Sequence, residues 1–343
     1  MKRSFVPFVF LTIPSLLGTT GTIRAQQKLP PKESLLWQKL ESSVRSEDQH
    51  LDGILGVAVL DLSTQHPLLL NADETFPTAS TIKIAILAEL FRQAQQGRLK
   101  LTDTYTLQQS DLVGGSGISS ALTPGVTKLT LRDVAVLMIS VSDNSMTNVL
   151  IDRVGLENVN DLLDSLGLTH TRLRRKMMDI KAAAEGRENV ATPRELMLLL
   201  EALFRGKVLN QQLTDDYFKL LAIHKESYIP RELPEDLKIA NKPGELEGVR
   251  NDCGLIFTGN RPYILCAMSS YLRHEREAGD AISRISGETY RMFDRLNRAS
   301  NLGRVVSPRD SSAPRRGLGS AMASARHRSF PDPWSLVLLA ARY

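Results

Sequence analysis

The chain has 343 residues, of which 42% are hydrophobic, 24% charged and 6% aromatic, with 22 Gly, 16 Pro and 2 Cys, a composition that excludes a disordered chain, a collagen-like repeat and a disulfide scaffold. The formal net charge is +5, but residues 1–25 contribute +3 and residues 301–343 contribute +5, which leaves −3 for the rest. A nucleic-acid-binding domain needs cations clustered on a folded face, so we expect no nucleic-acid partner.

The N-terminal segment has the pattern of a secretory signal. The cationic start Lys2-Arg3 is followed by an apolar stretch over residues 5–17. About 13 apolar residues are too few to span a bilayer, so the sequence predicts a signal peptide over residues 1–25, with an uncleaved anchor as the alternative. Cleavage of the signal peptide would leave a mature protein that is periplasmic or secreted.

A helix and a β-hairpin are predicted next. Apolar residues at helical spacing predict a helix over residues 33–50. Two short β-type runs, 56–62 and 67–71, are separated by a polar loop and predict a hairpin.

Residues 78–206 are dominated by helical patterns. Thr130 with Asp133, and Thr192 with Glu195, resemble capped helix starts. Four glycines stand where helices should end, at Gly97, Gly155, Gly167 and Gly206.

The β pattern returns after about residue 238. Runs at 239–242, 253–258 and 263–268 precede a last helix over about residues 279–297. Strands from both ends of the chain, with helices between them, fit one antiparallel sheet beside an inserted helical lobe.

The predicted fold class is therefore α/β, with a five-stranded antiparallel sheet, flanking terminal helices and an inserted all-helical lobe. Within a domain over residues 26–300, the sheet lobe covers about 33–72 and 238–298, and the helical lobe about 78–225. We expect a cleft between the lobes. Residues 301–343 are rich in Arg, lack Lys and predict a disordered tail.

A serine and a lysine are spaced for nucleophilic chemistry at the start of a buried helix. Ser80 and Lys83 open a segment that is apolar nearly all round, which is typical of a buried helix. Their separation places both on one side, with Cβ atoms about 5–6 Å apart. A buried lysine has a lowered pKa and can take the proton of a serine. The alternative is a terminal Ser with a snorkelling Lys, but an unused Lys inside such a helix is costly.

Two further polar clusters follow along the chain. Ser-Asp-Asn at residues 142–144 lies in the break between two predicted helices, where a plain helix cap is the alternative. Lys-Pro-Gly at residues 242–244 ends a β-run, where a strand entering a turn is the alternative.

In this order, the three clusters resemble the active-site motifs of the penicillin-recognising serine enzymes. The resemblance includes the flanks 76–83, 137–144, 169–173 and 191–193, and it is to the class A β-lactamase family over roughly residues 33–298. The fold that it implies, a sheet lobe against an all-helical lobe, agrees with the element order. We expect a monomer that needs no cofactor.

Carried over residue by residue, the resemblance implies Ser80 as the acylated nucleophile and Lys83 as its base or proton partner. Ser142 would pass a proton to the leaving nitrogen. Asn144 would hold the side-chain amide of the substrate, and Lys242 would attract its carboxylate.

The resemblance also implies where the acyl oxygen and the carboxylate bind. The backbone N–H groups of Ser80 and Glu245 would donate to the oxyanion, and Gly244 belongs to the same motif. Arg250 would reinforce the carboxylate site.

The chain departs from the family in the loop that frees the acyl-enzyme. Counting from Thr171 places Met177 and Lys181 where the family carries a Glu and an Asn that position water. A thioether offers no useful base. Glu185 and Asn189 have the same spacing eight positions later and stay open as a replacement, and so do two further carboxylates, Asp179 and Glu188.

Other features of the sequence stay open. Pro243 replaces the usual hydroxyl residue of the family and supplies neither a hydroxyl nor an N–H. Cys253 and Cys266 share one face of a predicted hairpin, where they form either a disulfide or two small buried residues. Residues 114–117, Gly-Gly-Ser-Gly, predict a mobile loop near the cleft. The six histidines show no ligand spacing, so we expect no metal: His50, His66, His170, His224, His274 and His327.

The leading hypothesis is an exported serine hydrolase that opens the amide of a β-lactam through a Ser80 acyl-enzyme. The departure in the loop predicts that deacylation is slow. One alternative is a D-alanyl peptidase or esterase-like enzyme that acts on cell-wall peptides. Another is a penicillin-binding sensor module that is acylated once and does not turn over.

Overall fold

The structure, a computed structural model, describes residues 29–300 and 302–305 of the chain. All but the last of these belong to the unit Met1–Arg304, the first of two units of the chain. The predicted signal peptide lies outside the described residues, and so does the predicted tail apart from residues 302–305.

One five-stranded antiparallel sheet is built from both ends of the unit, as the sequence predicts. Its strands are β1 (Ile54–Asp61), β2 (Pro67–Leu70), β7 (Ile239–Leu246), β8 (Val249–Ile256) and β9 (Tyr263–Ser270). Their spatial order is β2-β1-β9-β8-β7. The N-terminal hairpin therefore joins the C-terminal strands through the β1–β9 pair, and β7 lies at an edge.

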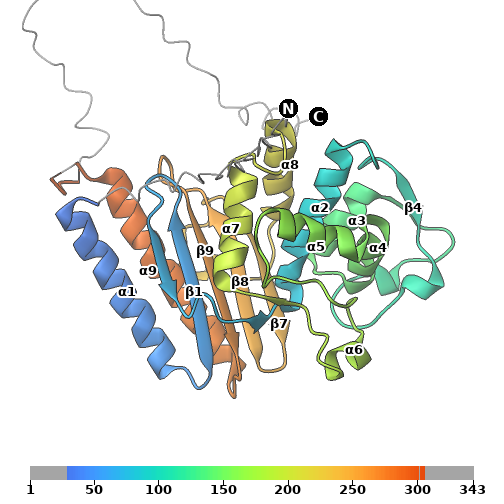
Figure 1. Cartoon of the computed structure of the whole chain (residues 1–343), viewed down its shortest axis with the longest axis horizontal. Helices are drawn as coiled ribbons and strands as arrows, with labels where there is room; N and C mark the ends of the chain where they lie inside the picture. Colours follow the sequence, from blue (N-terminus) through green and yellow to red (C-terminus); the bar gives the residue numbers. More distant parts are fainter. Residues whose placement is uncertain (1–28, 301, 306–343) are drawn as a thin grey trace, which may run out of the picture. The chain divides into compact units, whose positions relative to one another are not determined.

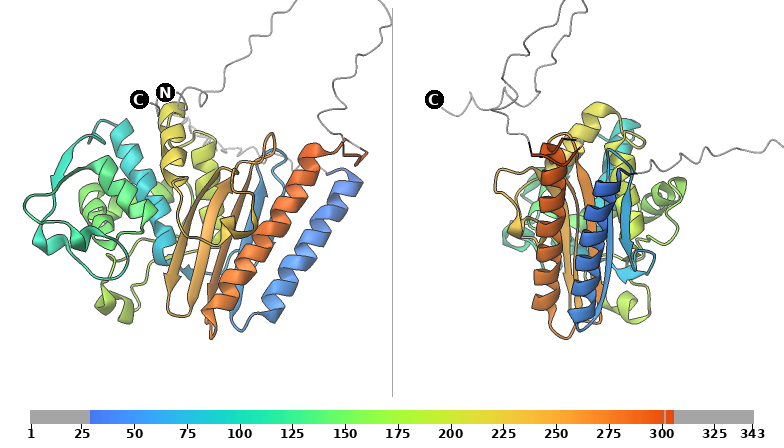
Figure 2. Two further views of the ribbon diagram at one scale, coloured as in Figure 1. Left: turned by 180° about the vertical axis from the view of Figure 1, so that it is seen from behind. Right: turned by 90° about the vertical axis from the view of Figure 1, so that its left-hand side faces the viewer.

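Helices cover both faces of this sheet. The two terminal helices, α1 (Pro31–His50) and α9 (Glu275–Arg298), lie side by side on one face, and α7 (Pro193–Phe204) packs on the other (Figures 1 and 2). Because both faces are covered, β1 is apolar on both. Val57 belongs to the core beneath the terminal helices, whereas its neighbour Ala58 belongs to the core on the opposite face.

The helical lobe surrounds one buried helix. Helix α2 (Lys83–Gln95) contacts the other long helices of the lobe, and every residue from Lys83 to Phe91 is buried. This confirms the prediction drawn from its all-round apolar surface. The surrounding helices are α3 (Leu131–Ser140), α4 (Asn144–Val154), α5 (Leu156–Ser165) and α8 (Gln211–Leu221).

Short elements connect these parts. The 3-10 turns are η1 (Ala79–Ile82), η2 (Gln109–Asp111), η3 (Ser119–Ala121) and η4 (Ile229–Glu232), and a short helix α6 spans Ile180–Ala184. Two small two-stranded sheets pair β3 (Phe76–Pro77) with β6 (Val190–Ala191) and β4 (Thr104–Thr106) with β5 (Lys128–Thr130).

The local signals for helix ends are confirmed. Thr130 and Asp133 form a capping box at the start of α3, and the Thr192 side chain accepts a hydrogen bond from the backbone N–H of Glu195 at the start of α7. The four glycines expected at helix ends all adopt positive φ angles, between 66° and 84°. Glycine adopts such angles without steric cost.

Several boundaries differ from the prediction, among them that of β8, which spans Val249–Ile256 rather than residues 253–258, and two of the differences have identifiable reasons. The last helix begins at Glu275 rather than near Gly279, and glycine is needed inside it because a Cβ there would lie 2.6 Å from the ring of Tyr228. Strand β7 continues through Pro243 to Leu246 instead of entering a turn. Since β7 is an edge strand, the missing N–H of proline does not break the sheet.

The placement of α7 also refines the predicted lobes. Its residues fall inside the range expected for the helical lobe, yet α7 packs against β1, β8 and β9. Within the described ranges, 29–300 and 302–305, no helix is both long enough and apolar enough to cross a membrane.

The two cysteines form a disulfide, one of the two alternatives that the sequence leaves open. Cys253 on β8 lies directly opposite Cys266 on β9, with 4.0 Å between the Cα atoms, and both residues are fully buried. The bridge joins the neighbouring strands β8 and β9 on the face that packs against the helical lobe.

Removing this bridge should destabilise the sheet without changing the fold. We expect the double variant Cys253→Ala, Cys266→Ala to lose about 3 kcal/mol of unfolding free energy, because a short closed loop restricts the unfolded chain. Urea unfolding measures the difference. A reductant should lower the midpoint of the wild type and leave that of the double variant unchanged. Equal midpoints for both oxidised proteins would contradict the prediction.

Candidate active site

Ser80 lies where the sheet and the helical lobe meet. It sits in η1, the 3-10 turn that leads into α2, rather than in the first turn of α2 itself. The preceding residue, Ala79, has a φ of 48°, a conformation that non-glycine residues rarely adopt and that is often found beside active sites. The side chain of Ser80 is partly exposed and lines a cleft.

Gly244 allows the edge strand β7 to approach this turn. A Cβ at Gly244 would lie 2.7 Å from the carbonyl oxygen of Thr78 and 2.9 Å from the backbone nitrogen of Ser80. Only glycine avoids these contacts with backbone atoms. Gly244 therefore lets β7 pack against η1 at the backbone of Ser80.

The Ser142 hydroxyl joins the three predicted motifs. Its Oγ donates a hydrogen bond to Ser80 Oγ at 2.9 Å and accepts from Lys83 Nζ at 3.0 Å and from Lys242 Nζ at 3.1 Å. The sequence places Ser80 and Lys83 together by their spacing and adds Ser142 and Lys242 only through the family resemblance. The structure brings all four into one cluster. Among the hydrogen bonds of the described residues, Lys83 reaches Ser142 and not Ser80 directly.

The Lys83 ammonium has three acceptors. Besides Ser142 Oγ, it donates to the carbonyl oxygen of Ser142 at 2.7 Å and to Asn144 Oδ1 at 3.2 Å. Asn144 Nδ2 donates to the carbonyl oxygen of Gly114 at 3.2 Å. The glycine-rich loop predicted near the cleft thus lies against Asn144.

Asp143 holds the break between α3 and α4 in place. Ser142 has a φ of 55°, so the chain is strained at the residue whose hydroxyl joins the site. Fully buried Asp143 caps α4 by accepting from Met146 N, and its carboxylate also accepts from the backbone N–H groups of Ile118 and Ser119. These contacts fix the position of Ser142.

Burial and a neighbouring positive charge lower the pKa of both cleft lysines. Burial, then the charge of Lys242, holds the pKa of Lys83 well below its usual value, although Asp143 raises it. Burial, then the charge of Lys225, lowers the pKa of Lys242 to about 7, while Asp252 and Glu245 raise it. Lys242, whose pKa is lowered to about 7, can therefore exchange protons near neutral pH, and Lys83 loses its proton more readily than a free lysine does.

The cleft has a volume of about 500 Å³. Its lining includes three predicted site residues with exposed or partly exposed side chains, Ser80, Ser142 and Glu245, together with the ammonium-bearing Lys242. A loop between α8 and η4 contributes three further residues that the sequence did not suggest: His224, Lys225 and Glu226. In the sequence these three residues are only a polar run after a predicted helix, and such a run does not indicate that they line a cleft formed with distant segments.

Arg250 lies apart from this lining. Its guanidinium donates to the carbonyl oxygens of Leu246 and Val249, both at 2.7 Å, and lies 3.8 Å from the carboxylate of Glu275. The Glu245 side chain accepts a hydrogen bond from the Tyr228 hydroxyl at 2.5 Å. The roles inferred for Arg250 and the Glu245 backbone stay predictions.

Met177 and Lys181 occupy the loop where the family carries its water-positioning residues. The backbone of Met177 is held by Asn148, which accepts from its N–H at 2.7 Å and donates to its carbonyl at 3.1 Å. The Met177 side chain is buried in the core of the helical lobe, and Lys181 is exposed. Neither side chain is among those that line the cleft in the described part of the chain.

The replacement carboxylates hold the loop together instead. Glu188 pairs with Arg175 at 2.6 Å, and Asp179 caps α6. Glu185 is exposed and pairs with Arg187 at 2.6 Å.

Asn189 also closes this loop. Its buried side chain accepts from the backbone N–H groups of Arg174 and Arg175 and donates to the carbonyl of Arg175. Asn189 therefore closes the loop, although it follows Glu185 at the spacing that the family uses to position water. Within the described residues, no cluster of His, Cys, Asp and Glu is arranged to hold a metal ion.

Comparisons with known proteins agree with this arrangement. A family model described as the beta-lactamase enzyme family matches residues 36–293. Beta-lactamase SME-1 of Serratia marcescens is 25% identical over 232 residues, which cover 66% of this chain and 78% of that protein. Beta-lactamase ROB-1 of Haemophilus influenzae is 28% identical over 253 residues, or 72% and 81% of the two chains.

Solved structures are similar over most of their length. A beta-lactamase from Sphaerobacter thermophilus has a TM-score of 0.69 and 32% identity, covering 75% of this chain and 96% of that one. PBP-A has a TM-score of 0.69 and 25% identity, covering 75% and 97%. A mutant of PBP-A, with a TM-score of 0.69, 26% identity and coverage of 77% and 97%, is an acyl-enzyme complex with penicillin G.

Replacing Lys242 by Met should weaken the increase of stability with pH. The pKa of Lys242 is lowered from 10.5 to about 7 in the folded chain. Between these values the unfolded chain binds more protons, so the unfolding free energy rises with pH. We expect this rise, measured by urea unfolding between about pH 7 and pH 9.5, to be smaller by about 3 kcal/mol in Lys242→Met.

Lys176→Met is the matched control for this measurement. Lys176 is exposed and pairs with Asp152 on the surface. Its variant should keep the pH dependence of the wild type. Identical slopes for Lys242→Met and the wild type would contradict the prediction.

Proposed function

Because the chain belongs to the class A β-lactamase family, we propose that it is a serine hydrolase that opens the amide of a β-lactam through an acyl-enzyme at Ser80. The observation that carries this proposal is the Ser142 hydroxyl, within hydrogen-bonding distance of Ser80, Lys83 and Lys242. We further propose that it acts as an exported monomer, with a signal peptide over residues 1–25 and a tail over residues 301–343.

Acylation uses the hydroxyl–ammonium cluster. Ser80 Oγ attacks the lactam carbonyl as its proton moves toward Lys83, which must be neutral to accept it; its lowered pKa favours that form. The path between them runs through Ser142 Oγ. The Ser80 Oγ–carbon bond forms, the amide C–N bond breaks, and Ser142 delivers the proton to the leaving nitrogen.

The surrounding groups bind the substrate. The backbone N–H groups of Ser80 and of Glu245, the residue after Gly244 on the strand that packs against η1, donate to the developing oxyanion. Protonated Lys242 attracts the substrate carboxylate, with Arg250 as a second cation near the end of the strand pair. Asn144, whose amide lies between Lys83 and the 114–117 loop, contacts the side-chain amide of the substrate.

Release of the acyl group should be slow, since Met177 and Lys181 replace the residues that position water. This observation favours two related functions. One is a D-alanyl peptidase or esterase-like enzyme that transfers the acyl group of a cell-wall peptide. The other is a penicillin-binding sensor, and the likeness to PBP-A, solved as a penicillin acyl-enzyme in mutant form, supports it.

Ser80→Ala should abolish covalent labelling by a fluorescent penicillin. The wild type should bind one label per chain, because the nucleophile is the only group of the cluster that becomes acylated. Gel fluorescence and intact mass measure the label, and a chromogenic cephalosporin measures turnover. Rapid turnover supports the hydrolase, and a lasting label supports the sensor. Equal labelling of both proteins, or none of either, would contradict a Ser80 acyl-enzyme with β-lactams.

Glu185→Gln should leave the release rate of that label within about twofold of the wild type, a change below about 0.4 kcal/mol in barrier. The reason is that Glu185 is exposed, paired with Arg187 and absent from the described cleft lining. Decay of the labelled protein after removal of free penicillin measures release. A loss of tenfold or more would make Glu185 the base and refute this assignment of the loop.

A further inference from the structure

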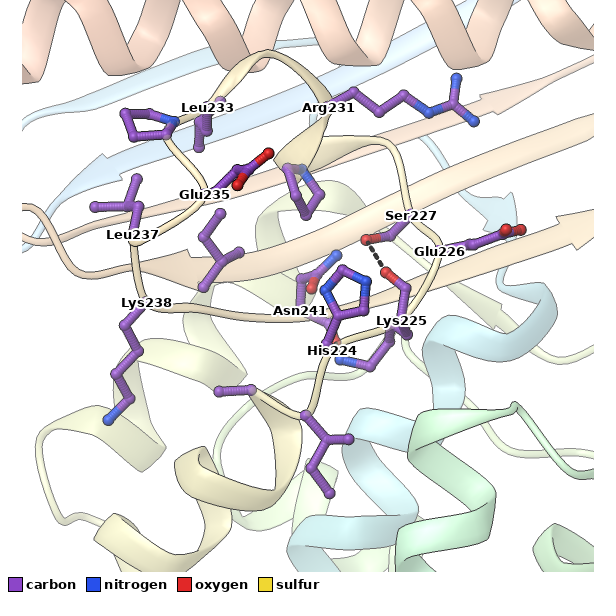
Figure 3. A pocket seen from close by; sticks show the side chains of 15 residues that line it. His224, Lys225, Glu226, Ser227, Arg231, Leu233, Glu235, Leu237, Lys238 and Asn241 are labelled. Carbon is purple, nitrogen blue, oxygen red and sulfur yellow. Dashed lines mark hydrogen bonds between the residues drawn. The ribbon is translucent and has the colours of Figure 1, made fainter. Parts of the chain in front are cut away.

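Lys225 is a buried cation beside the cleft that the acylation chemistry does not use. It is 9% exposed and lies in the loop between α8 and η4. Its Nζ donates to the carbonyl of Leu221, the last residue of α8, at 2.8 Å and to the carbonyl of Asn241 on β7 at 3.1 Å. Figure 3 shows Lys225 close to His224 of the same loop and to Asn241 of β7.

These two bonds link the helical lobe to the edge of the sheet. The last carbonyls of a helix have no partner within the helix and carry its negative dipole end, which suits an ammonium. Strand β7 is an edge strand, so the carbonyls on its open side have no strand partner. One ammonium therefore satisfies an unpaired carbonyl on each lobe.

The anchored residue directly precedes Lys242. The Asn241 side chain donates to buried Asp252 on β8 at 2.8 Å, while its carbonyl accepts from Lys225. Asp252 in turn accepts from the backbone N–H groups of Tyr228 and Ile229, which close the same loop. The backbone that carries Lys242 is thus held from both sides.

Lys225 also contributes to the charge around the Lys242 ammonium. The charged groups facing Lys242 are Lys83 from α2, Lys225 from the loop, Asp252 from β8 and Glu245 from β7. His224 and Glu226 line the same cleft. After burial, Lys225 is the main cause that lowers the pKa of Lys242, and burial lowers the pKa of Lys225 itself only to about 8. Lys225 therefore stays largely protonated at neutral pH.

We propose that Lys225 is a positioning residue for Lys242: its ammonium ties the end of α8 to the strand position before Lys242 and places a second positive charge beside the carboxylate-binding group. This inference rests on the proposed function, because it assigns the substrate carboxylate to Lys242. Lys242 binds that carboxylate only when protonated. The second-order rate constant of acylation, which reports the free enzyme, then falls as the pH rises through about 7.

Neutral and charged replacements of Lys225 separate the effect of its two hydrogen bonds from the effect of its charge. Lys225→Met and Lys225→Gln remove the charge, whereas Lys225→Arg keeps it. We expect both neutral variants to acylate about tenfold more slowly than the wild type near pH 6, because the tie of β7 to α8 is lost or weakened. In both neutral variants, the pH at which the acylation rate constant falls should rise by about one unit, because the charge that repels protonated Lys242 is absent. Lys225→Arg should keep the pH at which the wild type falls.

Fluorescent penicillin labelling from about pH 6 to about pH 9 measures this profile, with Lys176→Met as the matched control for loss of a lysine elsewhere. A uniform loss at every pH, with the fall unmoved in both neutral variants, would overturn the proposal and leave Lys225 a structural residue. An unchanged rate and an unchanged profile would also overturn it.

A second measurement does not depend on acylation. NMR spectra of protein carrying ¹³Cε-labelled lysine, assigned through Lys242→Met, follow the titration of Lys242 directly. Its midpoint should rise in Lys225→Met and stay in Lys225→Arg. If the wild type takes no penicillin label, the proposed function fails, and this midpoint still tests Lys225. An equal midpoint in the wild type and Lys225→Met would refute the role.

Discussion

The site depends on one hydroxyl that belongs to neither lobe's regular structure. Ser142 Oγ bonds to Ser80 at the turn before α2, to Lys83 in α2 and to Lys242 on β7. Its position requires a left-handed backbone conformation, which the buried carboxylate of Asp143 stabilises by binding the loop before it and the helix after it. The strain and the cap together place one polar atom where the sheet and the helices meet.

Burying positive charge between the sheet and the helices costs free energy. The fold offsets this cost with hydrogen bonds to neutral oxygen atoms rather than with ion pairs. Lys83, Lys225 and Lys242 are all buried, and most of their hydrogen bonds go to carbonyl and hydroxyl oxygens. Neutral acceptors stabilise an ammonium less than a carboxylate does, so burial lowers the pKa of all three lysines, that of Lys242 to about 7 and that of Lys225 only to about 8. The burial that reduces stability below neutral pH therefore also gives Lys83 and Lys242 the lowered pKa values that the proposed base and the proposed carboxylate-binding group require, a trade that active sites often make.

The sequence predicts what local chemistry determines and misses what packing determines. Caps such as Thr130 with Asp133, and the glycines after helices, mark boundaries correctly because their cause lies within a few residues. Pro243 and Gly279 mislead, because an edge position and the ring of Tyr228 decide their roles. Ser80 and Lys83 are found from spacing, but Lys225 reaches the cleft only because α8 ends beside β7.

The loop over residues 174–189 shows why an acid and an amide at the spacing used by the family need not position water. Of its candidates, Glu188 and Asn189 are bound to Arg175 and the backbone beside it and close the loop, while Glu185 is exposed and pairs with Arg187. The carboxylates that line the cleft, Glu226 and Glu245, come from the α8–η4 loop and β7 instead. The slow release of the acyl group that we propose fits these contacts, because the carboxylates of this loop bind its own arginines and cap α6 and are not among the described residues that line the cleft.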